Sequence, residues 1–291
     1  DRSRGLGDVY KRQFLHFLSG DFKQCLPVVP RGGRSGITAV SLNQSPLWEY
    51  MVKTTLSQSM RLAPGLEYWQ DYVESVGTGE INNQLDQVEI RHVNITREVD
   101  DIINFIYPDL CQTDPNSVIL ATLNCTINSI NSRIIDAAPG APTIYYSIDH
   151  AISDDEERNY PPEFLNTIEM GCLPPHQLKL KIGTPIVIIR NIQHPIMVNG
   201  TRATVSALRP NVIEARKHDG TNILIPRITI IPSDSNNSIS FKRKQFPVKP
   251  CYAMTINRSQ GQVCNTILQS LYYPKNIYSN TLCNINFLIT G

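Results

Sequence analysis

The sequence carries almost no net charge and has no long apolar run. Its 27 Lys and Arg residues are balanced by 26 Asp and Glu residues, which leaves a formal net charge of +1. This balance excludes a basic field over the whole chain, so any nucleic-acid contact must come from local patches. Because no apolar run approaches the roughly 20 residues that span a bilayer, we expect no membrane partner.

Several motifs that mark enzymes are also missing. The phosphate-binding loop G-x-x-x-x-G-K-[ST] does not occur, so the usual cradle of backbone N–H groups and lysine is not encoded. Neither G-x-S-x-G nor H-E-x-x-H occurs, which argues against an unrelated α/β hydrolase. The seven cysteines include no C-x-x-C pair and no nearby H-x3-5-H, so no metal site is predicted. Scattered cysteines in an odd number indicate free thiols and an intracellular location.

Basic residues gather in two short runs. Lys242-Arg243-Lys244 is one run, and Lys179 with Lys181 is the smaller one. Runs of this kind are more often solvated faces than binding sites. Each is nevertheless a candidate for local contact with nucleic-acid phosphates, and the residues alone leave both interpretations open.

The two ends of the sequence differ from the rest. Residues 1–13 (DRSRGLGDVYKRQ) have no periodic apolar face and look like a translated sequencing adapter, so we exclude them from fold prediction. The natural protein is then expected to continue upstream of Phe14. Residues 263–291 are rich in Asn, Tyr and Ile without a periodic apolar face. Intron read-through would give this composition, so we expect a non-native, poorly packed tail; a divergent last helix and strand is the alternative.

Hydrophobic periodicity predicts an α/β chain interrupted by a β-rich stretch. Helices are expected over residues 46–50, 66–76, 99–106 and 126–135, and strands over 14–18, 52–56, 117–121, 178–182, 185–189, 201–208, 212–216, 222–231 and 246–256. Asn199-Gly200 is a strong signal for a tight hairpin turn, because such turns need residues that tolerate positive φ. Short strands at this spacing are typical of a small barrel or meander. Residues 178–231 are therefore predicted to form a compact antiparallel β-unit.

Three polar groups follow predicted strands, where ligands bind in α/β sheets. The first, Gly20-Asp21-Phe22-Lys23-Gln24, ends in a glutamine that can orient a water at a terminal phosphate. The second contains Arg61, whose guanidinium can supply bidentate donors to a phosphate. The third, Thr255-Ile256-Asn257-Arg258-Ser259-Gln260-Gly261, has hydroxyls, amides and a glycine that suit a grip on nucleic-acid phosphate. Taken singly, each group also fits a polar loop, a surface charge or a strand cap.

In their order along the chain, these groups resemble one family. The pattern G-D-F-x-Q-x-L-P-V, then L-x-x-x-M-R-L, then A-M-T-I-N-[KR]-S-Q-G-Q is similar to superfamily-one DNA helicases of the petite-integration-frequency (PIF) type, and most similar to those encoded by Helitron transposons. Collinear support comes from the segments ILATLN, YPPEFLN, LKLKIGTP, RN and NGTR. The resemblance covers roughly residues 14–262, which makes it more specific than any single motif.

The resemblance implies an α/β fold: part of a RecA-like motor of the P-loop NTPase type, with an inserted small SH3-like β-barrel. It implies a first motor domain over 14–62, a second over 63–170 and 241–262, and the insert over 171–240. The implied activity is ATP hydrolysis coupled to translocation on single-stranded DNA and duplex unwinding, in recombination, repair, telomere maintenance or transposon replication. The implied cofactors are ATP and Mg²⁺, the partners are single-stranded DNA and duplex junctions, and the implied location is the nucleus.

The resemblance also implies roles for individual residues. The catalytic residues would be Gln24, Arg61 (as the arginine finger) and Gln260. The nucleotide would be bound by the same three residues together with Gly20, Asp21 and Gly261. The residues implied to bind DNA are Asn124, Thr255, Asn257, Arg258 and Ser259.

The sequence departs from the family pattern at several points. The phosphate loop, the acidic Mg²⁺ motif expected before Gly20 and the final Arg-bearing motif are missing, and Arg258 stands where the family usually has Lys. The chain by itself is therefore not expected to hydrolyse ATP, because positioning and charge neutralisation at the phosphates supply nearly all of the catalysis. The alternative to an enzyme fragment is a non-catalytic transposon relic or a weak nucleic-acid-binding module.

Overall fold

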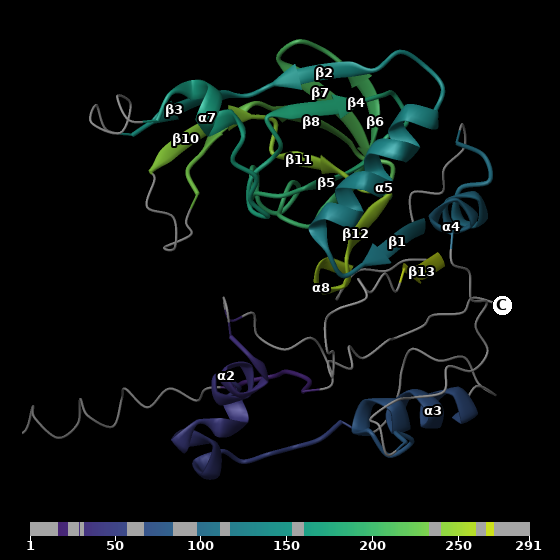
Figure 1. Cartoon of the computed structure of the whole chain (residues 1–291), viewed down its shortest axis with the longest axis vertical. Helices are drawn as coiled ribbons and strands as arrows, with labels where there is room; N and C mark the ends of the chain where they lie inside the picture. The colour runs from purple at the N-terminus through teal and green to yellow at the C-terminus, as the bar shows by residue number, and fades with distance from the viewer. Residues whose placement is uncertain are drawn as a thin grey trace, which may run out of the picture. The chain divides into compact units, whose positions relative to one another are not determined.

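A computed structural model describes residues 17–22, 29, 32–56, 67–83, 98–110, 117–152, 160–232, 240–259 and 266–270. The chain divides into two compact units, with the main division between Arg91 and His92 (Figure 1). The boundary predicted between residues 62 and 63 lies outside the described residues.

The described part of the first unit is helical. Its elements are α2 (Arg34–Ala39), η1 (Leu42–Gln44), η2 (Pro46–Tyr50) and α3 (Glu67–Thr78). Ser45 begins η2: its hydroxyl accepts a hydrogen bond from the Leu47 N–H, and Pro46 provides a preset φ at the first helical position. In α3, Trp69 is buried and packs against Tyr72. The helices predicted over 46–50 and 66–76 are confirmed.

Two predicted strands in the same unit are wrong where they can be checked. Phe17 and Leu18 are 86% and 66% exposed and have no regular structure, and residues 14–16 lie outside the described part. Val52 and Leu56 are almost fully exposed, and residues 52–56 have no regular structure. A strand needs a hydrogen-bonding neighbour, and the described residues of this unit contain no other strand for either run to join.

The second unit contains a parallel three-stranded sheet in the order β12-β1-β13, where β1 is Ser117–Ala121, β12 is Ala253–Thr255 and β13 is Thr266–Ser270. All of β1 is buried because both faces of the sheet are covered. Ile119 packs with α4 (Val99–Ile106) and α5 (Asn124–Ala137), and these two helices cover one face of the sheet (Figure 1). Val118 and Leu120 pack on the opposite side against Val187 and Ile189. The helices predicted over 99–106 and 126–135 and the strand over 117–121 are confirmed.

Strand β12 is held on both sides by hydrogen bonds. It pairs with β1 along one edge. On the other, the Asn131 side chain accepts from the Ala253 N–H at 2.9 Å and donates to the Ala253 carbonyl at 3.1 Å. A buried amide thus replaces a missing neighbouring strand, because it offers both a donor and an acceptor.

Part of the C-terminal tail belongs to this sheet. Residues 266–270 form β13, which pairs in parallel with β1 from Ser117↔Thr266 to Ala121↔Ser270. The prediction of a poorly packed tail is therefore wrong for these residues. The remainder of the tail lies outside the described residues.

The rest of the second unit is β-rich and antiparallel. One sheet has the order β11-β5-β6-β7-β8, a second is β3-β10-β9, and β2 pairs with β4. The strands are β2 (Thr143–Tyr146), β3 (Ile148–Ala151), β4 (Gln177–Leu180), β5 (Pro185–Ile188), β6 (Arg202–Leu208), β7 (Val212–Lys217), β8 (Asn222–Pro226), β9 (Ile228–Ile230), β10 (Phe241–Gln245) and β11 (Val248–Pro250), with the short helices α7 (Pro162–Asn166) and α8 (Ile256–Ser259).

The antiparallel β-unit predicted over residues 178–231 is confirmed, although its strands are distributed over separate sheets and no closed barrel is found among the described strands. Leu178 and Leu180 are buried in the core and Lys179 between them is not, as the alternation predicts, whereas the buried Lys181 and the exposed Ile182 depart from it. Gly200 has a φ of 90° in the turn that precedes β6, where a residue other than glycine would be strained.

Candidate nucleic-acid interface

The strongest candidate site lies where β1 and β12 end. The two strands run in parallel, and Ala121 at the end of β1 is level with Thr255 at the end of β12. The segments that follow both strands, the start of α5 and the whole of α8, therefore emerge at the same edge of the sheet (Figure 1). Ligands of open α/β sheets bind at this carboxyl edge.

This edge brings together the described residues that were predicted to bind DNA. Asn124 is exposed at the first position of α5, and Thr255 is partly exposed at the last position of β12. Ser259 in α8 donates its hydroxyl to the Ile256 carbonyl at 2.7 Å, so its oxygen keeps acceptor capacity. The backbone of Asn257 lies in α8, whereas its side chain is outside the described part.

Arg258 is exposed but already engaged with protein. Its Nη2 donates to the Gly171 carbonyl at 2.6 Å. The Nζ of Lys249 in β11 lies 3.2 Å from the same carbonyl and 3.2 Å from the Met170 carbonyl. Burial, and secondly the charge of Arg258, lowers the pKa of Lys249 to about 8. Two cations thus share one backbone oxygen beside α8, and no local pattern in the sequence marked Lys249 as part of this arrangement.

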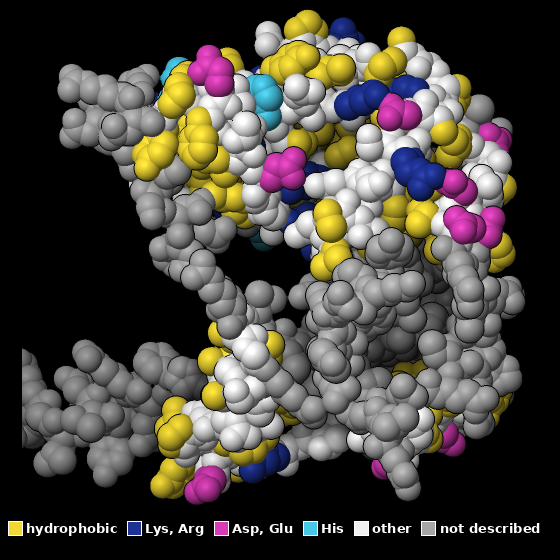
Figure 2. All heavy atoms as spheres, in the orientation of Figure 1, with side chains coloured by type: hydrophobic (Ala, Val, Ile, Leu, Met, Phe, Trp, Pro, Cys, Tyr) yellow, Lys and Arg dark blue, Asp and Glu magenta, His cyan; other side chains and the backbone are white. Residues whose placement is uncertain are grey.

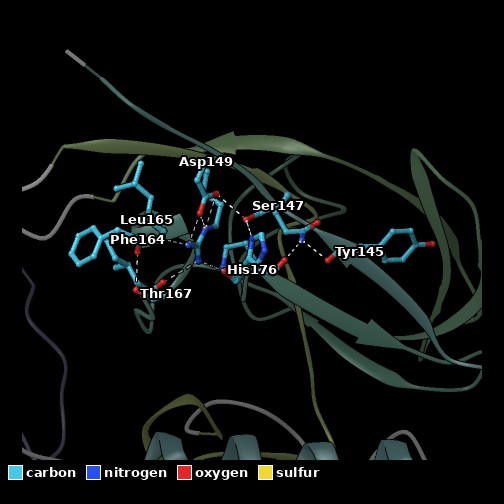
Figure 3. A network of polar contacts seen from close by, with 11 residues as sticks. Tyr145, Ser147, Asp149, Phe164, Leu165, Thr167 and His176 are labelled. Atoms are coloured by element: carbon cyan, nitrogen blue, oxygen red, sulfur yellow. Dashed lines mark hydrogen bonds and ion pairs between the residues drawn. The ribbon is translucent and has the colours of Figure 1, made fainter. Parts of the chain in front are cut away.

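A second group of contacts is centred on a buried ion pair between Arg243 of β10 and Asp149 of β3, and Figure 3 shows Asp149 within this network. The Arg243 and Asp149 side chains are 1% and 0% exposed, and Nη2 is 2.7 Å from Oδ2. The remaining guanidinium N–H groups donate to backbone carbonyls at 2.9 to 3.1 Å, those of Leu165, Ile168 and Pro174. All five donors of the guanidinium therefore have acceptors.

Two residues of the basic runs, Arg243 and Lys181, fit neither a solvated face nor a contact with nucleic-acid phosphates. Arg243 is neither solvated nor available to nucleic acid, because β10 alternates and places Phe241, Arg243 and Gln245 inward. Lys181 is also buried, and its Nζ donates to the Ala138 carbonyl just beyond the end of α5. A cation at a helix C-terminus satisfies carbonyls that have no partner within the helix.

A Ser–His–Asp group extends from the ion pair, but its order excludes a hydrolytic triad. The Ser147 hydroxyl donates to Asp149 Oδ1 at 2.8 Å, and its oxygen lies 2.8 Å from His176 Nδ1 (Figure 3). In a triad the histidine stands between the serine and the acid, so that it can take the serine proton. Here the serine stands in the middle and its proton is directed to the acid.

The residues predicted to bind the nucleotide are not brought together by the described structure. Gly20 and Asp21 are exposed in the first unit. A Cβ added to Gly20 would meet no atom within 4 Å, so no close approach to protein requires this glycine. The other four, Gln24, Arg61, Gln260 and Gly261, lie outside the described residues. Among the residues that the structure describes, no group of three or more His, Cys, Asp or Glu side chains could hold a metal ion.

Charge on the visible surface is mixed. On the face shown in Figure 2, Lys and Arg side chains lie next to Asp and Glu side chains and do not form one field. Exposed ion pairs such as Arg133–Asp100 and Arg209–Glu214 account for part of this mixing. Any nucleic-acid contact is therefore local, as the balanced composition predicts.

Two family models match segments of the chain: "PIF1-like helicase" over residues 15–87, and "DNA helicase Pif1, 2B domain" over residues 163–208. The chain is related to the Pif1-like helicases. The Pif1 2B-domain match begins at α7 and runs to the end of β6, which includes the carbonyls that Arg243, Lys249 and Arg258 contact.

Curated relatives agree with the Pif1 similarity. The ATP-dependent DNA helicase Pif1 of Bdellovibrio bacteriovorus is 25% identical over 193 residues, which cover 65% of this chain and 42% of that protein. The ATP-dependent DNA helicase PIF1 of Homo sapiens is 23% identical over 267 residues, which cover 87% of this chain and 36% of that protein. The chain thus spans less than half of the length of either relative.

Solved structures show the same fold. The Pif1 helicase of Candida albicans has a TM-score of 0.55 at 18% identity, with 86% of this chain and 57% of that chain covered. A Bacteroides Pif1 helicase in complex with ADP-AlF3 and ssDNA has a TM-score of 0.57 at 17% identity, with 88% and 56% covered. These likenesses establish a Pif1-type, RecA-like helicase fold. No described helix of the chain is both long and apolar enough to cross a membrane.

Proposed function

We propose that this chain is part of an ATP-dependent DNA helicase of the Pif1 type, which couples ATP hydrolysis to translocation on single-stranded DNA and to duplex unwinding. The observation that carries the proposal is the shared carboxyl edge of β1 and β12, where Asn124, Thr255 and α8 meet. The two family matches, one before β1 and the other between β1 and β12, support it.

In this proposal the edge grips the DNA backbone. The Asn124 amide and the Thr255 hydroxyl can each donate a hydrogen bond to a phosphate or sugar oxygen, whereas the Ser259 hydroxyl already donates to the Ile256 carbonyl. Asn257 would add a further amide. Contacts of this kind position a strand without reading its sequence. Arg258 is set apart from this group because it donates to a protein carbonyl.

The residues proposed to bind the nucleotide are Gly20, Asp21 and Gln24, Arg61 as the arginine finger, and Gln260 and Gly261 of the motif that follows β12. ATP with Mg²⁺ is the proposed cofactor, and it would supply the free energy for movement along DNA. The finer proposals are a Helitron-related origin, a nuclear location, activity at duplex junctions, and an SH3-like character for residues 171–240.

The chain alone is expected not to hydrolyse ATP. The phosphate loop and the acidic Mg²⁺ motif, both missing from this sequence, would provide positioning and charge neutralisation. These two effects supply nearly all of phosphoryl-transfer catalysis. Phosphate release by the purified chain, with and without single-stranded DNA, measures this directly. DNA-stimulated release above the background of the protein-free reaction would contradict the prediction.

The DNA-binding edge can be tested in the same chain. We expect a labelled oligothymidine to bind in fluorescence anisotropy, and Thr255→Val or Asn124→Ala to weaken binding about two- to tenfold, the value of one hydrogen bond. Thr229→Val is the matched control, since Thr229 is an exposed threonine on β9, outside the edge. Equal affinities for all four proteins would refute the proposed edge, and no binding by the wild-type chain would refute a DNA-binding role for the chain.

A further inference from the structure

Three cationic side chains bind the backbone of a single segment, residues 165–174, which we name the carbonyl strap. Arg243 of β10 donates to the carbonyls of Leu165, Ile168 and Pro174. Lys249 of β11 donates to those of Met170 and Gly171, and Arg258 of α8 donates to that of Gly171. The cations come from β10, β11 and α8, which lie in one run of chain, so the strap is attached to that run by three side chains.

The two ends of this run differ in freedom. At the Arg243 end the guanidinium is buried and each of its donors has an acceptor. A shift of the strap at this end would leave buried charged groups without partners, which is costly. At the Arg258 end the side chain is exposed and one carbonyl is its described partner. The strap is thus anchored at one end and holds α8 at the other.

Helix α8 needs such a tether. It has four residues, which is about one turn, and a single turn is unstable in isolation because nucleation costs more than its hydrogen bonds return. Ile256 packs against the cluster that contains Val118, Leu120, Val187 and Ile189, and the Ser259 hydroxyl bonds within the helix itself. The Arg258–Gly171 bond joins α8 to the carbonyl strap.

We propose that Arg258 is a positioning residue: it fixes α8 to the carbonyl strap, and Lys249 shares its Gly171 anchor. In this arrangement Arg258 makes no contact with a DNA phosphate, and its replacement acts on DNA only through the position of Thr255 and Ser259. The mechanical role stands on the geometry above, whereas its consequence for DNA rests on the proposed function. The pKa of Lys249 is lowered first by burial and secondly by the charge of Arg258, which agrees with the closeness of the two cations at Gly171.

Hydrogen exchange of the full chain, measured by mass spectrometry, tests the tether without DNA. Arg258→Gln is expected to raise exchange about twofold in peptides that cover residues 168–173 and 253–259, the value of one solvent-exposed hydrogen bond. Arg258→Lys, which keeps a cationic donor, should raise it less. The matched control is Arg133→Gln, which removes an exposed arginine paired with Asp100 on α5 and α4. Unchanged exchange in both peptides for Arg258→Gln would overturn the proposal.

The salt dependence of oligothymidine binding then separates positioning from phosphate contact. Each phosphate contact on single-stranded DNA contributes about 0.7 to the slope of log affinity against log salt concentration. A positioning residue predicts a lower affinity for Arg258→Gln with an unchanged slope. A slope reduced by about 0.7 would overturn the proposal in favour of a phosphate contact. If the wild-type chain binds no DNA, the proposed function fails, and the exchange experiment still decides the tether.

Discussion

Arg243 and Arg258 use the same chemistry on the same carbonyl strap, but their surroundings are opposite. Arg243 is fully buried with an acceptor for every N–H, and Arg258 is exposed with one described acceptor. A buried guanidinium has a structural role, since removing one of its partners leaves a buried charge that neither a partner nor water stabilises. An exposed one costs little to release, so it can move when a ligand arrives. Position relative to the core therefore decides which arginine stabilises and which can serve function.

The largest effect is expected at the buried end. Arg243→Ala leaves the buried Asp149 carboxylate without its cationic partner and removes the guanidinium donor from three carbonyls, and should lower the free energy of unfolding by roughly 3–5 kcal/mol. Urea denaturation followed by circular dichroism measures the change. Lys242→Gln is the control, because Lys242 precedes Arg243 on the same strand but is exposed. A loss for Arg243→Ala no larger than that of the control would mean that the ion pair contributes nothing to stability.

A double-mutant cycle sharpens the same point. Asp149→Leu alone leaves a buried guanidinium with too few acceptors and should also destabilise the second unit strongly. Combined with Arg243→Leu, the total loss should be smaller than the sum of the two single losses by about 1–3 kcal/mol, because neither partner is then left charged and alone. Strictly additive losses would contradict a direct coupling between the two side chains.

Lys249 lies between the two ends and should give stability a pH dependence. Its pKa is 10.5 in an unfolded chain and about 8 in the fold. Between these values the unfolded state binds more protons, so the free energy of unfolding rises with pH. From pH 7.5 to 9.5, wild type should gain on the order of 1–2 kcal/mol relative to Lys249→Met, which cannot titrate. A difference that does not change with pH would show that Lys249 keeps its ordinary pKa.

The smallest effect on stability is expected at the exposed end. Arg258→Gln should change the free energy of unfolding by no more than about 0.5 kcal/mol, as is usual for surface positions. The denaturation experiment used for Arg243→Ala gives both values under identical conditions. A loss comparable to that of Arg243→Ala would remove the distinction between a structural and a functional arginine.

The sequence predicted elements best where the pattern was complete within a few residues. The helix over 99–106 was predicted with the bounds that the structure has, because its isoleucines repeat at helical spacing and Pro108 follows. The strands expected near Leu18 and Val52 failed, because a strand depends on neighbours that a local pattern does not contain.

The buried arginine shows a signal that was present but not used. Phe241, Arg243 and Gln245 alternate, so the run of basic residues could not all face solvent if the segment was a strand. The partner Asp149 was beyond prediction, since it lies on another strand far earlier in the chain. Of the candidate site, the sequence predicted which residues follow β1 and β12. It could not predict that the two strands are neighbours, or that Arg258 has a carbonyl partner.

The adjacency of β1 and β12 also constrains how the chain folds. Ile119 pairs with Ala253, so this contact closes a loop of about 130 residues, and an unstructured loop of that length is entropically expensive to close. The cost falls if the antiparallel unit forms first, because its own hairpins are local and its folded state holds its two ends close together. The parallel pair of β1 and β12 then forms as a late step, after the segment between the two strands has folded. We therefore expect this carboxyl edge to be among the last parts of the second unit to be completed during folding, and among the first to be lost when that unit loosens.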